Sequence, residues 1–295
     1  SHRQAPANTI AVTAANDLGK YRCHWVVCAW WLGAGGCVID YGVAEVTGTD
    51  TTHDHEASEP MIYKALLQWR DELLQKKYVD ATGVERKVDF CLVDSGAFTN
   101  AAYEFCRQVR GIFHPSKGQV PYHPRKTSST NTLAGSNLHA VHMPSQDIWL
   151  YELDTNYWKQ WLHERYLTPT FDENNMLRRG SMSLYQPEGN KRHSSFAQHI
   201  VAEELVSEFK EGKGSKTYWT VRNENNHWLD ASYMAAAASE VCGVKLIAPA
   251  ETTVQPRQVN DGDKKKQTNA QPRKQHGQGR FRTRPGGWIP RRNNG

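Results

Sequence analysis

The feature that most constrains the fold of this chain is one short apolar segment, residues 88–93. It lacks the alternation of apolar and polar residues that marks a strand with one solvent-exposed face. It therefore predicts a strand buried on both faces, as in parallel sheets. Apolar residues at helical spacing over 59–78 come before it. A second helix is expected from Thr99 to Val109, with Thr99 or Asn100 as its N-cap. Strands that alternate with helices in this way predict an α/β fold with parallel pairing.

An antiparallel meander is expected at the start of the chain. Its three strands are predicted at 8–16, 21–31 and 37–46, and glycine-containing turns separate them. The later pattern predicts a polar loop at 115–137, a hairpin at 138–152, helices at 155–167, 194–209 and 227–242, and a strand at 216–221. The expected fold is therefore α/β, with a mixed sheet in which parallel strands follow a three-strand antiparallel meander, flanked by helices.

Charge divides the chain of 295 residues into a body and a tail. Residues 251–295 hold 11 Lys and Arg against three acids, a net charge of +8, which leaves −3 for the remainder. We expect a linker or cloning remnant at 1–8, a folded domain at 9–248 and a disordered basic tail at 249–295. The tail suits a polyanion such as nucleic acid, an acidic protein surface, or simply a solvated terminus. No apolar run approaches the roughly 20 residues of a membrane span.

Three acids stand at the ends of predicted elements. Asp17 closes the first strand, Asp94 closes the buried strand, and Asp230 lies in the first turn of the last helix. Open α/β sheets bind ligands at the carboxyl ends of their strands. If the first and fourth strands are parallel neighbours, Asp17 and Asp94 emerge side by side.

Clustered carboxylates repel one another unless a proton or a cation neutralises them. Oxygen ligands favour Mg²⁺ or Mn²⁺, and two such ions about 3.5–4 Å apart support phosphodiester hydrolysis. Each acid also has an ordinary explanation when taken alone. Asp17 suits a turn, Asp94 suits a turn or helix cap, and Asp230 complements a helix dipole.

Several basic residues are candidates for contact with a DNA backbone. Lys117, Arg125 and Lys126 fall in the polar loop, and His227 precedes Asp230 by three residues on one helix face. Phosphate contacts carry no sequence information, so such residues predict cutting with little sequence preference. A plain surface role for the lysines and a capping role for His227 remain open.

The order and spacing of these motifs resemble the nuclease domain of phage terminase large subunits of the phage-lambda type. The resemblance covers roughly residues 9–247 and rests on 13–17, 38–42, 93–96, 117–118, 195–203 and 226–230. It implies a ribonuclease H-like fold and metal-dependent cutting of concatemeric viral DNA. It also implies that Asp17, Asp94 and Asp230 hold two Mg²⁺ or Mn²⁺ ions. Asn16 departs from the apolar residue usual in the family, so Asp40 is the alternative first ligand.

We therefore expect an endonuclease domain of a DNA-packaging terminase. The alternatives are another ribonuclease H-like enzyme, such as a transposase, integrase or junction resolvase, and a non-catalytic DNA or portal-docking module. No GxxxxGK[ST] motif for an ATPase motor occurs, so we expect the cutting part of a larger protein.

The resemblance also implies partners and a location. These are double-stranded DNA, a terminase small subunit and a portal or procapsid in the host cytoplasm, with no membrane. The isolated domain is expected to be monomeric and the full motor oligomeric. In the tail, Arg284, Trp288 and Ile289 form an aromatic and basic segment expected to dock on the portal.

Overall fold

The computed structural model describes residues 1–49, 56–124, 132–134, 137–187, 189, 192–210 and 214–244. Its helices are α1 (Glu59–Gln75), α2 (Thr99–Val109), α3 (Thr155–Leu167), α4 (Ser194–Ile200) and α5 (His227–Val241), with a short 3₁₀ turn at Glu56–Ser58. Its strands are β1 (Gln4–Ala5), β2 (Thr9–Asp17), β3 (Arg22–Trp31), β4 (Gly35–Glu45), β5 (Tyr78–Asp80), β6 (Glu85–Arg86), β7 (Phe90–Asp94), β8 (Phe113–Gln119), β9 (Thr132–Ala134), β10 (Leu138–Met143), β11 (Ile148–Asp154), β12 (Met182–Leu184), β13 (Glu203–Lys210) and β14 (Gly214–Val221).

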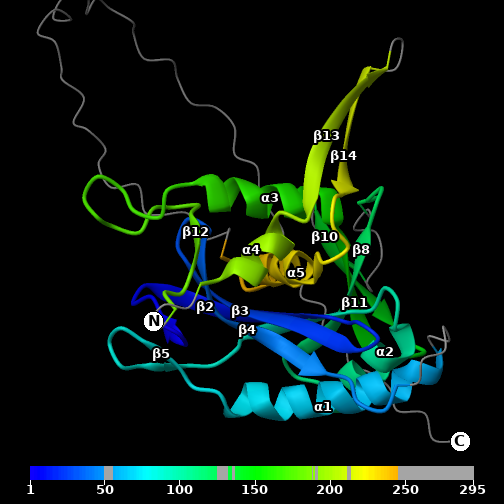
Figure 1. The fold of residues 1–295 in the computed structure, drawn as a ribbon. Helices are drawn as coiled ribbons and strands as arrows, with labels where there is room; N and C mark the ends of the chain where they lie inside the picture. The colour runs from blue at the N-terminus through cyan, green and yellow to red at the C-terminus, as the bar shows by residue number, and fades with distance from the viewer. Residues whose placement is uncertain are drawn as a thin grey trace, which may run out of the picture. The chain divides into compact units, whose positions relative to one another are not determined.

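One mixed sheet organises this part of the chain. Within the described residues its strand order is β12-β4-β3-β2-β7-β8-β11-β10-β9. Strands β2, β3 and β4 form the antiparallel meander, and β2, β7, β8 and β11 pair in parallel. This confirms the predicted ribonuclease H-like class, a mixed sheet of an antiparallel meander and parallel strands flanked by helices (Figure 1).

The two faces of the sheet carry separate cores. On one face, Val12 and Ala14 of β2 pack with apolar residues of α1 and α2. On the other face, Ala11 and Ala15 pack with residues of α3, α4 and α5. Because successive strand residues point to opposite faces, Asp17 lies on the same face as Ala15, beneath α5.

Helix α5 lies unusually deep, between the sheet and α3 (Figure 1). Its four alanines at 235–238 are all fully buried, and side chains this small let a helix axis approach a sheet closely. Thr13 Oγ1 donates a hydrogen bond of 2.7 Å to the carbonyl of Ala235, and Trp30 Nε1 donates to the same hydroxyl at 2.7 Å. These buried contacts fix α5 against β2 and bring its first turn to the carboxyl end of the sheet.

The structure differs from the sequence prediction in three places. The helix predicted at 194–209 ends at Ile200, and the chain continues as β13, which pairs with β14 from Glu203–Val221 to Lys210–Gly214. Pairing with a partner strand outside the segment overrides its local helical pattern. The loop predicted at 115–137 begins with strand β8, so Lys117 lies on a strand. Residues expected in an N-terminal linker include β1, which pairs with β5.

Candidate active site

Two of the three acids leave neighbouring strands at the same edge of the sheet. Asp17 is the last residue of β2 and Asp94 the last of β7. These strands pair in parallel with Asn16 opposite Val93, which places the two following carboxylates side by side. Asp230 approaches from the first turn of α5, the helix that packs on these strands. The structure therefore brings together the three acids that the sequence singled out.

The pKa values of the three carboxylates are shifted in part by one another's negative charge. Burial, followed by the charge of Asp17, raises the pKa of Asp94 to about 7, and Asp230 adds to the rise. Burial is also the largest cause that raises the pKa of Asp230 to about 7 and the pKa of Asp17 above its usual range. Asp94 accepts a hydrogen bond of 3.2 Å from the Gly96 backbone, and it forms no salt bridge with any described residue.

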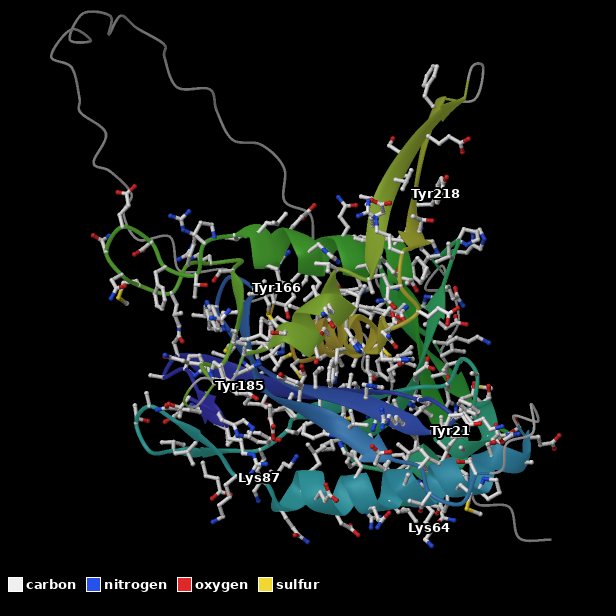
Figure 2. All side chains as sticks on the ribbon, in the orientation of Figure 1. Tyr21, Lys64, Lys87, Tyr166, Tyr185 and Tyr218 are labelled. Carbon is white, nitrogen blue, oxygen red and sulfur yellow. The ribbon has the colours of Figure 1, made fainter. Side chains whose placement is uncertain are left out.

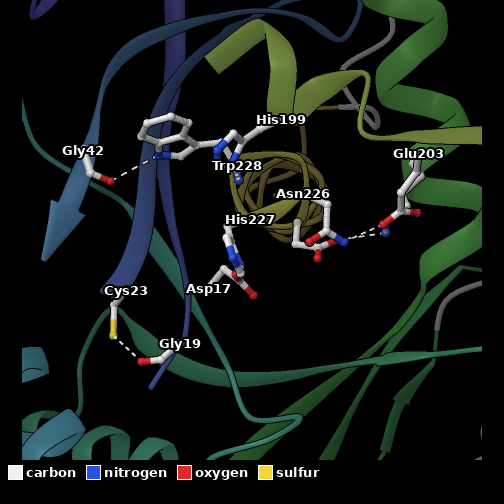
Figure 3. Close-up of polar contacts among 11 residues, drawn as sticks. Asp17, Gly19, Cys23, Gly42, His199, Glu203, Asn226, His227 and Trp228 are labelled. Carbon is white, nitrogen blue, oxygen red and sulfur yellow. Dashed lines mark hydrogen bonds and ion pairs between the residues drawn. The ribbon is translucent and has the colours of Figure 1, made fainter. Parts of the chain in front are cut away.

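A buried lysine of α3 partners Asp230. Lys159 Nζ lies 2.9 Å from Asp230 Oδ1 and 2.6 Å from Glu203 Oε1. Asn226 Nδ2 donates to the same Glu203 oxygen at 2.6 Å (Figure 3). Burial disfavours the charge of Lys159, but the two carboxylates outweigh it and raise its pKa. Lys159 and Glu203 form an ion pair beside the three acids. The sequence analysis did not predict this ion pair.

His227 partners Asp17. Its Nδ1 lies 2.9 Å from Asp17 Oδ2, and this hydrogen bond is the largest cause that raises the pKa of His227 (Figure 3). The ring of His24 stacks on His227 with centroids 4.5 Å apart. His227 was predicted to contact DNA. Its position next to Asp17 would allow such a contact at the site.

Of the other predicted residues, Lys117 lies on the strand next to Asp94 and the rest fall outside the described residues. Lys117 is exposed on β8, one residue beyond Ser116, which lies opposite Asp94 in the parallel register. At the next residue, Gly118, the backbone of β8 lies so close to Thr155 that an added Cβ would come within 2.5 Å of the Thr155 hydroxyl oxygen. Arg125, Lys126, Arg284, Trp288 and Ile289 fall outside the residues that the structure describes.

Asp40, the alternative first ligand, has different neighbours. It is 2% exposed and binds four groups of the N-terminal and α1–β5 segments, namely His2 Nε2 (2.7 Å), Arg3 Nε (3.1 Å), Lys76 Nζ (3.4 Å) and Tyr78 hydroxyl (3.4 Å). A carboxylate already surrounded by donors serves to hold these segments together. This arrangement favours Asp17 over Asp40 as the acid that acts with Asp94 and Asp230.

The donor set suits a hard divalent cation. All three acids offer carboxylate oxygens, and Asp94 is a partly buried carboxylate without a cationic partner among the described residues. In this part of the chain no three His, Cys, Asp or Glu side chains already close around a common point. Lys159 pairs with Asp230 and His227 pairs with Asp17. These contacts offset the repulsion between the like-charged carboxylates at this edge of the sheet.

In the described structure, no helix is both long and apolar enough to cross a membrane.

Comparison with known proteins identifies the family. Residues 1–252 match the family described as terminase large subunit gpA, endonuclease domain. Neither the curated proteins nor the solved structures gave a match. The match spans most of the 295 residues, so the chain belongs to this endonuclease family of the viral DNA-packaging motor.

Proposed function

From this family membership and the geometry of the three acids, we propose that the chain cuts concatemeric double-stranded DNA into genome units by metal-dependent hydrolysis. The observation that carries the proposal is the convergence of Asp17, Asp94 and Asp230 from two parallel strands and one helix. These carboxylates would hold two Mg²⁺ or Mn²⁺ ions. When bound, such ions lower the pKa of a water and stabilise the negative charge of the reacting phosphate.

The surrounding residues hold the acids in place. Lys159 bridges Asp230 and Glu203, and Asn226 binds the same glutamate, so Asp230 is tied to α3 and to the start of β13. His227 fixes Asp17 by a direct hydrogen bond. A catalytic group must be held within about 0.5 Å of its productive position, which is the role that these contacts serve.

One site of this kind cuts one strand. A double-strand break therefore requires two protomers or two successive events, which agrees with an oligomeric motor. Lys117, together with Arg125 and Lys126, would hold the DNA backbone without reading its sequence. We further propose that a terminase small subunit and the portal select where and when cutting occurs, in the cytoplasm of the host.

Plasmid cleavage tests the proposal. Supercoiled DNA is incubated with the protein in Mg²⁺, Mn²⁺ or EDTA, and nicked and linear products are measured on a gel. We expect cutting with either metal, none in EDTA, and none by Asp94→Asn. Asp71→Asn, an exposed acid on α1, serves as the matched control and should cut normally. Full cutting by Asp94→Asn would refute the site.

The same assay separates the two rival functions. A marked preference for branched or transposon-end DNA over linear duplex would favour a junction resolvase or transposase. DNA binding without cutting under every metal condition would favour a docking module.

A further inference from the structure

A cavity of about 800 Å³ lies beside His227, the partner of Asp17. It lies at the β2–β3 turn and the start of β3, and the residues that matter here are Lys20, Tyr21, Arg22, His24, His199 and His227. His227 belongs to both places, since it lines the cavity and binds Asp17. Cavities of roughly 300–1,000 Å³ hold ligands of the size of a nucleotide. A molecule in this cavity would therefore contact His227, the residue that binds Asp17.

Three histidines form the inner wall of the cavity. The centroids of His24 and His227 are 4.5 Å apart, and His199 lies 5.5 Å from His24 and 5.9 Å from His227. The backbone N–H of Trp228 donates to His199 Nδ1 at 3.3 Å (Figure 3). An accepting Nδ1 places the proton of the neutral ring on Nε2, so His199 keeps an N–H donor that no described residue uses.

His24 provides a second sign of unused polar capacity. The residue is only 8% exposed, and its Nδ1 is buried without a hydrogen-bond partner among the described residues. Buried polar atoms of folded proteins nearly always have a partner, so an exception calls for an explanation such as a ligand. This unpartnered atom belongs to a residue that lines the cavity.

The mouth of the cavity carries cations and an exposed aromatic ring. Tyr21 is 51% exposed, and Lys20 Nζ lies 5.5 Å from the centre of its ring (Figure 2). Arg22 pairs with Glu45 at 3.2 Å, but both side chains are more than 60% exposed, so this pair is weak and exchangeable. Cations that hold phosphates and rings that stack on bases are the usual elements of a site for a nucleic-acid strand.

We propose that this cavity is a substrate subsite that holds the nucleotide adjoining the cut phosphodiester. Its phosphate contacts Lys20, Arg22 and the N–H of His199, and its base packs against Tyr21. The inference rests on the proposed function, since it takes DNA as the ligand. It assigns the alignment of the cut strand to residues outside the three acids.

The test measures DNA binding without cutting. A fluorescent 20-base-pair duplex is titrated with the Asp94→Asn protein in Mg²⁺ at several salt concentrations. The pocket variant combines Lys20→Gln with Arg22→Gln, and Tyr21→Ala is made separately. The matched control combines Lys64→Gln on α1 with Lys87→Gln after β6, two exposed lysines that do not line the cavity (Figure 2).

We expect the pocket variant to weaken binding at least tenfold and to reduce the slope of log K against log salt by about 0.9, the change for one neutralised phosphate. Tyr21→Ala should weaken binding by about tenfold with the slope unchanged, because stacking releases no counterions. The control should stay within about twofold. Thermal unfolding checks that each variant is folded.

The outcomes separate this inference from the proposed function. Equal weakening by the pocket variant and the control would show general electrostatic attraction and overturn the subsite. Unchanged binding by the pocket variant, or no binding by the parent protein, would also overturn it. Pocket-specific loss of binding, together with no cutting by the wild-type protein in any metal, would support a DNA site at the cavity and refute the nuclease proposal alone.

Discussion

Replacing Asp94 by Asn should stabilise the metal-free protein at pH 8 and have little effect at pH 4. Burial, with the neighbouring charge of Asp17, raises the pKa of Asp94 from 3.8 to about 7. Because the folded protein binds this proton more tightly than the unfolded chain does, stability falls as the pH rises from about 4 to about 7. Above that pH range Asp94 is ionised in the folded protein, and the anion lowers the free energy of unfolding by its full amount. Asn carries no charge and so avoids this loss.

The size of the effect follows from the same pKa. The full rise corresponds to roughly 4 kcal/mol, at about 1.4 kcal/mol for each pKa unit. Since water screens part of the charge at the edge of the sheet, we expect a gain of about 2 to 4 kcal/mol at pH 8. Asn keeps a carbonyl oxygen of similar shape, so the hydrogen bond from the Gly96 backbone is preserved.

Urea unfolding in EDTA at pH 4, 6 and 8 measures this difference. Asp71→Asn is the control and should follow the wild type at every pH. Added Mg²⁺ should then stabilise the wild type at pH 8, because an ion that binds only the folded state adds to its stability. The Asp94→Asn protein should gain little. A variant less stable than the wild type at pH 8, or a gap that does not change with pH, would refute the reasoning.

Four further outcomes are expected. Asp40→Ala should lower the free energy of unfolding by about 3 kcal/mol, because it leaves the largely buried Lys76 and the buried Tyr78 hydroxyl without their anion, while the folded fraction still cuts plasmid DNA. Lys159→Met should destabilise the metal-free protein by about 3 kcal/mol in urea unfolding, since it strands two buried carboxylates, and should slow cutting more than tenfold. Deleting 251–295 should weaken DNA binding and flatten its salt dependence in a titration, whereas an unchanged slope would show that the tail does not touch DNA. Replacing Trp288 and Ile289 together by Ala should reduce retention by the matching portal protein in a pull-down and leave cutting in solution normal.

Local patterns single out the three acids as ends of elements, and the family resemblance groups them as one site. Asp17 and Asp94 end segments whose apolar residues identify them as strands, and Asp230 begins a segment of helical small residues. The parallel pairing that joins the first two acids followed from the buried character of 88–93. Helices α2 and α3 have the predicted bounds for the same reason, since their periodicity lies within the segment.

The partners of the acids were not predictable in this way. Lys159 and Glu203 are 44 residues apart, and His227 and Asp17 are 210 residues apart, so no local pattern links either pair. Lys159 occupies a position that looks like any polar residue of an amphipathic helix, yet it is 5% exposed. Its role depends on where β13 begins, and the sequence pattern there predicted a helix instead.

The distribution of cations explains how three acids can be buried at one edge of a sheet. Lys159 compensates Asp230 and Glu203 together, and His227 compensates Asp17. Asp94 has no cation among the described residues, and its pKa is raised to about 7. The pKa of Asp230 is raised to about 7 as well, so the two acids share the electrostatic cost of the metal-free fold. A divalent ion that binds at Asp94 relieves its share of this cost and does not have to displace an ion pair there. Removing the Asp94 carboxylate should therefore weaken metal binding while it stabilises the metal-free fold at pH 8, which makes this position the sharpest single test of the site.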